Sequence, residues 1–282
     1  MIAGSGRLDV IASPIGNVAD LSPRARAALA GADLVAAEDT RRTGTLLAAI
    51  GVSRPLLSLH EYNEEARVAE LIARLGAGAV IALVSDAGTP LISDPGFALV
   101  RAAAAAGIEV RPIPGPSAVT AALSVAGLPT DRFAFEGFLP ARAGERRNAL
   151  ERLAGEARTL VFFEAPHRIV GTLGDMARTF GGARRALLGR ELTKTHETLY
   201  RGTLAQLVAL AAGEPNLARG EITLVVEGAP AAAEQGDLAL LHKALALLLP
   251  ELPPARAAAI AGQLAGVTRA RAYALALELA AK

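Results

Sequence analysis

Residues 79–96 read AVIALVSDAGTPLISDPG. The first six are apolar, and a short apolar run bounded by turn residues predicts a buried β-strand at 79–84. The loop that follows is built mainly from Gly, Pro, Ser, Thr and Asp, the residues that turns use. We expect a helix over residues 95–106, ended by Gly107. A strand, a loop and a helix in this order form the repeating unit of an α/β fold.

The same alternation continues on both sides of this stretch and predicts an α/β fold with a largely parallel sheet. In the first half of the chain we expect further strands at residues 8–12, 33–37, 55–59 and 109–112, and a helix from Ser22-Pro23 to about residue 30. In the second half we expect strands at 132–138, 159–163, 183–190, 198–201 and 221–227, and helices at 143–154, 166–180 and near 204–212.

Two stretches of boundary or linker composition predict that the chain forms two α/β domains and a small helical extension. A proline-rich stretch at residues 115–130 separates the two series of strands, so we expect domains at residues 1–120 and 121–230. A linker rich in Ala, Gly and Pro follows at residues 228–236. Beyond it, Leu and Ala recur at helical spacing, which predicts an extension at 237–282 with helices at 237–249, 254–264 and 268–281.

The composition excludes several classes of protein. The chain has 282 residues, 52% of them hydrophobic, and a net charge of +1. These values exclude a disordered chain and a strongly basic protein that wraps nucleic acid, although they allow a local basic surface. Because the chain has no cysteine, it has no disulfide, no thiolate nucleophile and no cysteine-bound metal.

Neither export nor membrane insertion is expected. The longest window without charge lies between Arg111 and Asp131, and its four prolines would break a spanning helix. Residues 1–8 lack the apolar core of a signal peptide. We therefore expect a cytoplasmic protein with no membrane partner.

The common nucleotide-binding and hydrolase motifs are missing from the sequence. The chain has no G-x-G-x-x-G after its first strand, no P-loop and no G-x-S-x-G elbow. Its four histidines lack the H-E-x-x-H spacing of a zinc site, so we expect no metal.

Four loops share the edge of the sheet where ligands of open α/β folds bind, outside the carboxyl ends of the strands. They follow the first, second, fourth and fifth strands, at residues 13–17 (SPIGN), 38–42 (EDTRR), 85–96 and 114–118 (PGPSA). Turn chemistry explains any one of these loops. Four together, with acidic residues beside glycines on one rim, favour a ligand site.

These loops and two later motifs, FFEAPHR at 162–168 and RELTK at 190–194, occur in an order that resembles the tetrapyrrole-methylase superfamily of S-adenosylmethionine (SAM)-dependent methyltransferases. Within it they resemble a branch of ribosomal RNA methyltransferases. The resemblance covers residues 8–227, and the helical tail is similar to the C-terminal extension of that branch. The first loop lacks the richer glycine content of general tetrapyrrole methylases, which counts against a porphyrin-type substrate.

The resemblance implies a fold and an activity. It implies two α/β domains with the cofactor cleft between them, SAM as the cofactor without a metal, and a homodimer. It also implies methylation of the 2′-hydroxyl of a cytidine in the decoding region of 16S ribosomal RNA, within the small ribosomal subunit. Two alternatives remain open at this point: a tetrapyrrole or protein methyltransferase of the same fold, and a non-catalytic RNA-binding assembly factor.

Carried onto this sequence, the family's cofactor cleft comprises Asp86, Ala87, Gly88, Leu91, Ile92, Ser117, Ala118, Ala165, Leu192 and Ile222. Gly88 lets the backbone approach a ligand closely, since glycine has no Cβ. Asp86 either accepts hydrogen bonds from the ligand or caps its own turn, and the sequence leaves both open.

A base near the ribose would help the reaction, because a hydroxyl is a poor nucleophile while protonated. Candidates at or beside predicted strand ends are Asp39, Glu164, His167, Glu191 and Lys194. Two of them also have a structural explanation: His167 suits the first turn of a helix, and Glu191 is close enough in sequence to pair with Arg190 or Lys194. Positioning without a base is the remaining alternative.

Contact with RNA phosphates is expected from Arg41, Arg42, Arg146, Arg147, Arg168 and Lys194. The alternative for the arginines near 146 is an ordinary solvated helix face, since glutamates lie between them. Aromatic residues make up only 4% of the chain, which argues against platforms for base stacking. We therefore expect the RNA to be recognised by its shape and phosphates.

Overall fold

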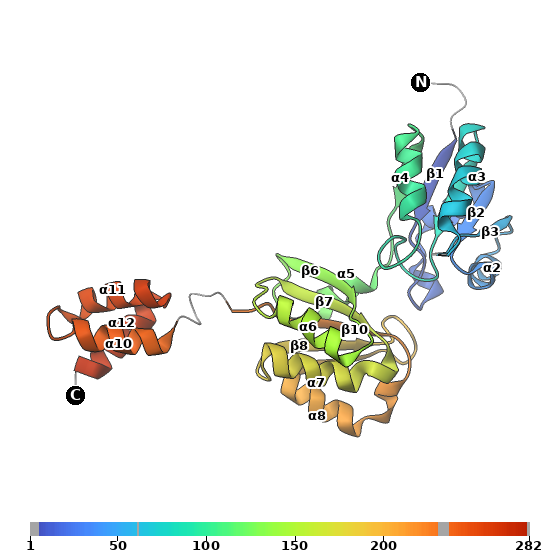
Figure 1. Cartoon of the computed structure of the whole chain (residues 1–282). Helices are drawn as coiled ribbons and strands as arrows, with labels where there is room; N and C mark the ends of the chain where they lie inside the picture. Colours follow the sequence, from blue (N-terminus) through green and yellow to red (C-terminus); the bar gives the residue numbers. More distant parts are fainter. Residues whose placement is uncertain (1–5, 61, 231–236, 281–282) are drawn as a thin grey trace. The chain divides into compact units, whose positions relative to one another are not determined.

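The computed structural model describes residues 6–60, 62–230 and 237–280. The chain divides into two compact units (Figure 1). The larger unit comprises Met1–Glu151 and Thr159–Glu227, and the smaller unit comprises Arg152–Arg158 and Gly228–Lys282. The larger unit contains two five-stranded sheets.

The first sheet is entirely parallel, with strand order β3-β2-β4-β1-β5. Its strands are β1 (Arg7–Ile11), β2 (Leu34–Ala37), β3 (Leu56–Ser58), β4 (Val80–Val84) and β5 (Glu109–Ile113). The helices of this half are α1 (Pro23–Gly31), α2 (Thr40–Ala49), α3 (Glu64–Gly76) and α4 (Phe97–Ala105), and the short 3₁₀ helix η1 covers Val18–Asp20. The five strands and α1 lie close to the ranges expected from the sequence, whereas no ranges were predicted for α2, α3 and η1.

Both faces of the first sheet are buried, which explains why its central strands read as continuous apolar runs. On one face, Leu8 and Leu83 pack with Leu71 of α3 and Leu99 of α4. On the other face, residues of β1, β2 and β4 pack with α1 and α2. The carboxyl ends of the parallel strands are therefore directed to one edge, where the loops seen in the sequence gather.

The second sheet is mixed rather than largely parallel, which corrects the expectation from the sequence. Its order is β6-β7-β10-β8-β9, and among these pairs β6–β7 alone is parallel. Hydrophobic periodicity carries no information about strand direction. The seven residues 191–197 between β8 and β9 were a usable signal, because a parallel crossover needs about a dozen.

The strands of the second sheet are β6 (Phe133–Phe138), β7 (Thr159–Glu164), β8 (Arg185–Arg190), β9 (Thr198–Thr203) and β10 (Ile222–Val226). Its α-helices are α5 (Ala118–Ala126), α6 (Ala143–Leu153), α7 (Ile169–Phe180) and α8 (Leu204–Gly213), and its 3₁₀ helices are η2 (Pro166–Arg168) and η3 (Pro215–Ala218). Helix α5 packs through Val119, Ala122 and Leu123 in a buried cluster that includes Val161, Leu187 and Val225 of the sheet.

Some helix boundaries differ from those expected, each for a local reason. Helix α4 begins at Phe97 rather than 95, where the Glu64 carboxylate accepts the backbone N–H groups of Ala98 and Leu99. The helix expected from residue 166 begins as η2 and becomes α-helical at Ile169. The two arginines of the second loop, Arg41 and Arg42, lie in the first turn of α2.

The smaller unit contains the three short helices expected from the sequence. They are α10 (Leu238–Leu248), α11 (Pro254–Ala265) and α12 (Arg269–Ala280), and residue 281 of the expected last helix lies outside the described residues. Leu241, Leu245, Ala257, Ala261 and Ala272 form the centre of their shared core. Within the described residues, we find no helix with the length and apolar character needed to span a membrane.

Candidate functional site

The loops that follow β1 and β4 are joined by a short antiparallel bridge. The Ser13 N–H donates to the Gly88 carbonyl at 2.9 Å, and the Gly88 N–H donates to the Ser13 carbonyl at 3.1 Å. Gly88 has φ +80°, a conformation that favours glycine. The bridge therefore fixes the two central loops of the first sheet at its ligand-binding edge.

A pocket of about 400 Å³ opens beside this bridge. Its walls come from the loops after β1, β2, β4 and β5 of the first sheet, and from β6, β7, β10 and their ends in the second sheet. The volume lies within the ~300–1,000 Å³ of typical small-molecule sites. Both halves of the larger unit therefore contribute to one pocket.

Eight of the ten cofactor residues inferred from the sequence line this pocket. They are Asp86, Ala87, Gly88, Ile92, Ser117, Ala118, Ala165 and Ile222. The other two, Leu91 and Leu192, have side chains that pack in apolar cores instead, Leu91 against the first sheet and Leu192 against the second.

The backbone is strained on two of the loops that the sequence singled out. Among the described residues, the non-glycine residues with left-handed φ are Leu91, Ser93, Glu191 and Thr193. Such conformations are uncommon for residues with a Cβ, and they concentrate at ligand sites. This clustering agrees with a functional role for the loops at 85–96 and 190–194.

One wall of the pocket is acidic, formed by Glu38, Asp86 and Asp94. The Asp86 N–H donates to Glu38 Oε2 at 3.2 Å, and Asp86 Oδ2 pairs with Arg42 Nη1 at 3.0 Å. The pKa of Asp94 is raised to about 6, mainly by burial and further by the negative charges of Glu38 and Asp86. A hydrogen bond from Ser85 lowers this pKa and offsets part of the effect. This wall is suited to a positively charged ligand.

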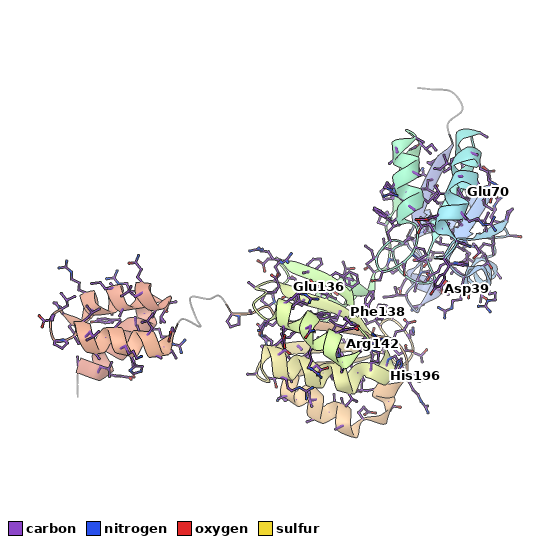
Figure 2. All side chains as sticks on the ribbon, viewed as in Figure 1. Asp39, Glu70, Glu136, Phe138, Arg142 and His196 are labelled. Carbon is purple, nitrogen blue, oxygen red and sulfur yellow. The ribbon has the colours of Figure 1, made fainter. Side chains whose placement is uncertain are left out.

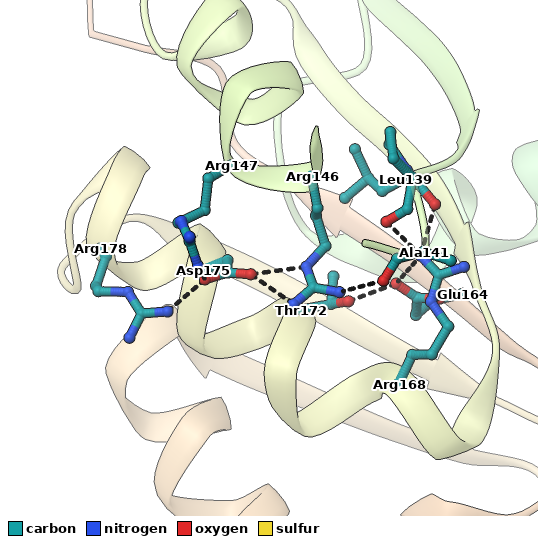
Figure 3. A network of polar contacts seen from close by, with 10 residues as sticks. Leu139, Ala141, Arg146, Arg147, Glu164, Arg168, Thr172, Asp175 and Arg178 are labelled. Atoms are coloured by element: carbon teal, nitrogen blue, oxygen red, sulfur yellow. Dashed lines mark hydrogen bonds and ion pairs between the residues drawn. The ribbon is translucent and has the colours of Figure 1, made fainter. Parts of the chain in front are cut away.

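Glu164 lines the pocket, but its carboxylate is already occupied (Figure 3). Oε1 accepts the Ala165 N–H at 2.7 Å and lies 3.1 Å from Arg168 Nε, and Oε2 accepts the Thr172 hydroxyl at 2.5 Å. Arg168 also donates to the carbonyls of Leu139 and Pro140. Glu164 and Arg168 therefore hold the end of β7 in place.

A second buried carboxylate, Asp175, lies one turn after Thr172 on α7 and ties α7 to α6 (Figure 3). It accepts from Arg146 Nε at 2.7 Å, pairs with Arg178 and lies 3.9 Å from Arg147 Nη1. Although burial raises the pKa of Asp175, hydrogen bonds from Arg178 and Arg146 hold it below its usual range. Arg146, itself buried, thus has a structural role.

The remaining base candidates from the sequence lie outside the pocket lining. Asp39 is the N-cap of α2 (Figure 2), and hydrogen bonds from Arg41 hold its pKa well below the usual range. His167 is exposed in η2. Lys194 Nζ binds Glu191 Oε1 at 2.8 Å and Glu221 Oε2 at 3.2 Å. Burial opposes both charges, yet this pairing keeps the pKa of Lys194 above its usual value and that of Glu191 below.

The expected RNA-contacting residues divide into internal and exposed groups. Arg146 and Arg168 are held in the internal ion pairs described above, and Lys194 is part-buried between two glutamates. Arg41 and Arg42 expose most of their side chains at the start of α2, and Arg42 also lines the pocket. Arg147 is about half exposed.

The pocket lining also includes residues that sequence reasoning did not select, among them Glu38, Asp94, Phe138 and Phe163. Glu38 and Asp94 stand in the quoted loops, so their position after the strands was a usable signal. Phe163 stands in the FFEAPHR motif, which was a usable signal, whereas Phe138 read as an ordinary strand residue that no pattern marked. In the described part of the chain, no group of three or more His, Asp or Glu side chains could hold a metal ion.

Comparison with known sequences gives consistent results over nearly the whole chain. Residues 7–208 match the family described as tetrapyrrole (corrin/porphyrin) methylases. Relatives named ribosomal RNA small subunit methyltransferase I are 52% identical in Xylella fastidiosa (strain Temecula1), covering 95% of this chain and 98% of the relative. Relatives with this name are 51% identical in Pseudomonas aeruginosa (97% and 98% covered) and 48% in Escherichia coli O157:H7 (97% and 95%).

Solved structures share the fold at low sequence identity. Uroporphyrin-III-C-methyltransferase from Thermus thermophilus has a TM-score of 0.54 at 24% identity, covering 79% of this chain and 94% of that chain. The methyltransferase CobJ has a TM-score of 0.59 at 21% identity, covering 80% and 95%. A T. thermophilus uroporphyrin-III C-methyltransferase in complex with S-adenosylhomocysteine has a TM-score of 0.56 at 20% identity, covering 79% and 97%.

These likenesses to solved structures concern the fold alone, whereas the matches to the curated sequences extend over almost every residue. The chain belongs to the tetrapyrrole methylase family and, within it, to the group whose members carry the name ribosomal RNA small subunit methyltransferase I.

Proposed function

We propose that this protein transfers a methyl group from SAM to the ribosomal RNA of the small subunit. The observation that carries this proposal is the 48–52% identity, over at least 95% of the chain, to relatives named for that activity. We further propose that the acceptor is the ribose 2′-oxygen of a cytidine in the decoding region of 16S ribosomal RNA, as the resemblance of the six loop motifs implies.

The residues of the pocket fit SAM. When bound, SAM supplies a methyl group on a positively charged sulfur, which is activated for displacement by an oxygen. The acidic wall of Glu38, Asp86 and Asp94 complements its sulfonium and ammonium charges. The small side chains of Ala87, Gly88, Ser117 and Ala118 leave room for a nucleoside against the backbone. These residues would hold the cofactor.

Asp94 is our candidate for the group that accepts the proton of the ribose hydroxyl. A proton acceptor works best when its pKa is close to the working pH, and that of Asp94 is raised to about 6. Glu164 is the one pocket residue among the five candidates from the sequence, and its carboxylate is already bound by three groups. We assign to Glu164 the role of fixing the Ala165 backbone.

RNA contact is assigned to the exposed arginines. Arg41 and Arg42 lie beside the pocket at the start of α2, and Arg147 is half exposed on α6. Because the net charge of the chain is only +1, binding depends on such local groups rather than on an overall positive field. Shape and phosphate contacts within the small ribosomal subunit then determine which nucleotide reaches the pocket.

The cellular setting and the assembly are also proposals. We propose that the protein acts in the cytoplasm, on small ribosomal subunits, and that it forms a homodimer, as the family resemblance implies. Light scattering of the purified chain measures the dimer directly: a mass of about twice the 28.8 kDa of the chain is expected. A monomer at micromolar concentration contradicts it.

The proposed activity is tested by incubating the purified protein with tritiated SAM and small ribosomal subunits that lack the modification. We expect tritium in 16S RNA, and 2′-O-methylcytidine after digestion to nucleosides. Label in the base or in a ribosomal protein contradicts the acceptor that we propose. Label in an added tetrapyrrole and none in RNA supports the other enzyme class. No label in any substrate, together with no binding of SAM by the protein, supports a non-catalytic assembly factor.

A further inference from the structure

Phe138, labelled in Figure 2, ends β6 and lines the pocket. The residue is nevertheless 57% exposed. Its ring stands edge-on to that of Phe163 with 5.7 Å between centroids, and Phe163 meets Phe135 in the same manner at 4.8 Å. Three of the seven phenylalanines of the chain thus form one cluster, and two of them, Phe138 and Phe163, line the pocket. The ring of Phe138 is supported on one side and accessible on the other.

A β-bulge in β6 places Phe138 on this wall. In a regular strand, Phe135 and Phe138 would lie on opposite faces, because side chains alternate. The register with β7 shifts between Phe135 and Gly137, so that Phe135 pairs with Val161 and Phe138 with Phe163. Both phenylalanines therefore lie on one face. Gly137 permits the bulge with φ +65°, and bulges of this kind re-aim side chains next to active sites.

The surroundings of the ring suit a nucleotide. A Cβ on Gly137 would lie 3.3 Å from the Ser93 hydroxyl, so the bulge abuts the loop that carries Asp94. Ser93 and Asp94 line the same pocket and offer hydrogen-bonding groups. Arg42, two-thirds of whose side chain is exposed, lines it as well and can meet a phosphate.

Resting on the proposed function, we propose that Phe138 is the platform on which the base of the methylated nucleotide stacks. A ribose can enter a pocket of this kind only when its nucleotide leaves the RNA stack, and proteins bind such bases on aromatic side chains. The low aromatic content of the chain argued against stacking platforms in general. One ring packed against Phe163 in the pocket lining is sufficient for one base. Recognition of the RNA through its phosphates alone gives this exposed ring no role.

The test compares three variants in the full-length protein. Phe138→Ala removes the ring, Phe138→Tyr keeps it, and Phe97→Ala removes a similarly exposed phenylalanine that is outside the pocket lining and packs beside Arg101. For each we would measure kcat/KM with small subunits, the Kd of S-adenosylhomocysteine by calorimetry and the melting temperature. Loss of stacking lowers kcat/KM for Phe138→Ala by about tenfold to 100-fold.

The expected pattern is specific to the RNA. Phe138→Ala loses activity on subunits while its Kd for S-adenosylhomocysteine stays within twofold of wild type, Phe138→Tyr recovers activity, and Phe97→Ala matches wild type. Unchanged kinetics for Phe138→Ala would overturn this inference but leave the proposed function intact. A weaker cofactor Kd that accounts for the whole loss shows that the ring binds the cofactor's adenine and also overturns it. A wild-type protein that binds S-adenosylhomocysteine but labels no RNA overturns the proposed function, and this inference with it.

Discussion

Asp94 connects the chemistry of single residues to pH. Its carboxyl lies among Glu38 and Asp86, with a hydrogen bond from Ser85, and Arg42 pairs with Asp86 beside it. If Asp94 accepts the proton of the ribose, methyl transfer must rise with pH through about 6, where this group loses its own proton. We expect Asp94→Asn to slow transfer and to remove that rise. Single-turnover rates between pH 5 and 8 measure both effects.

The matched control for this experiment is Asp131→Asn, an exposed aspartate outside the pocket lining. It should keep the wild-type rate and pH profile. A rise through pH 6 that survives in Asp94→Asn contradicts the assignment, since another group would then be responsible for it.

The same carboxyl predicts a pH dependence of stability. The pKa of Asp94 is raised from 3.8 to about 6 in the folded protein, so between these values the folded chain keeps a proton that the unfolded chain has lost. The contribution of Asp94 to stability is therefore present below pH 4 and lost as pH rises to about 6. Urea unfolding at pH 4.5 and 7 should show a smaller difference for Asp94→Asn than for wild type.

Gly88 is the residue whose backbone holds the two central loops together. At φ +80° an alanine is disfavoured by about 1–2 kcal/mol, so Gly88→Ala should lose about that much free energy of unfolding. The measurement is urea unfolding. Gly76→Ala, at the end of α3 with open space around its Cβ position, serves as the control and should be as stable as wild type or slightly more so.

At the scale of elements, the network around Asp175 joins α6 to α7 (Figure 3), and Thr172 of α7 donates to Glu164, which lines the pocket. Asp175→Ala leaves the buried Arg146 without its partner, and breaking a buried pair in this way costs about 3–5 kcal/mol. Glu145→Ala removes the exposed partner of Arg142 and should cost less than about 1 kcal/mol. Guanidinium unfolding of both variants compares them, and equal losses would contradict the structural role of Asp175.

Some of these elements could be predicted from the sequence and others could not. Residues 79–96 predicted β4 and its loop, since a buried parallel strand leaves an uninterrupted apolar run and its ligand-binding loop uses distinctive residues. The direction of β8, β9 and β10 left no mark in the periodicity. The bulge at Gly137 also left no mark in the sequence, because residues 135–138 (FEGF) have the pattern of a regular strand end. Arg146 looked like a surface charge for a related reason: its partner Asp175 is 29 residues away.

The pocket lining was more predictable than the chemistry. Of the ten residues expected at the cofactor, eight line the pocket, and six of these follow β4 and β5, parallel strands that end at one edge. The base candidates depended on side-chain contacts across the fold, which a single sequence does not encode. Asp39 and Lys194 were attractive by position, but Asp39 caps α2 and Lys194 pairs with Glu191 and Glu221.

At the scale of the whole molecule, the RNA binding that we propose for a chain of net charge +1 is expected to depend on a few local arginines. Each phosphate contact that is lost reduces the slope of log affinity against log salt by about one. We expect Arg41→Ala to show this reduction, while Arg67→Ala, which removes an exposed arginine paired with Glu70 on α3, leaves the slope unchanged. Filter binding of small subunits between 50 and 300 mM salt measures both. The same slope for all three proteins would place the RNA elsewhere.

The two units have separate cores, which predicts the effect of truncation. The clusters on both faces of the first sheet and the cluster under α5 contain no residue from 237–280, and the buried residues of the helical cluster lie within 241–276. A chain that ends at residue 230 should therefore bind S-adenosylhomocysteine within twofold of the full-length Kd. Calorimetry measures this, and loss of binding in a truncated chain that remains folded would show that the helices complete the site.

The pocket built by both sheets is the central element of this account, and a crystal structure with S-adenosylhomocysteine tests it most directly. We predict that the nucleoside lies against residues 86–88 and 117–118 on one side and Glu164, Ala165 and Ile222 on the other. We also predict that the sulfur faces the acidic wall and that the ring of Phe138 stays accessible. A molecule bound elsewhere, with this pocket holding only solvent, would contradict the account.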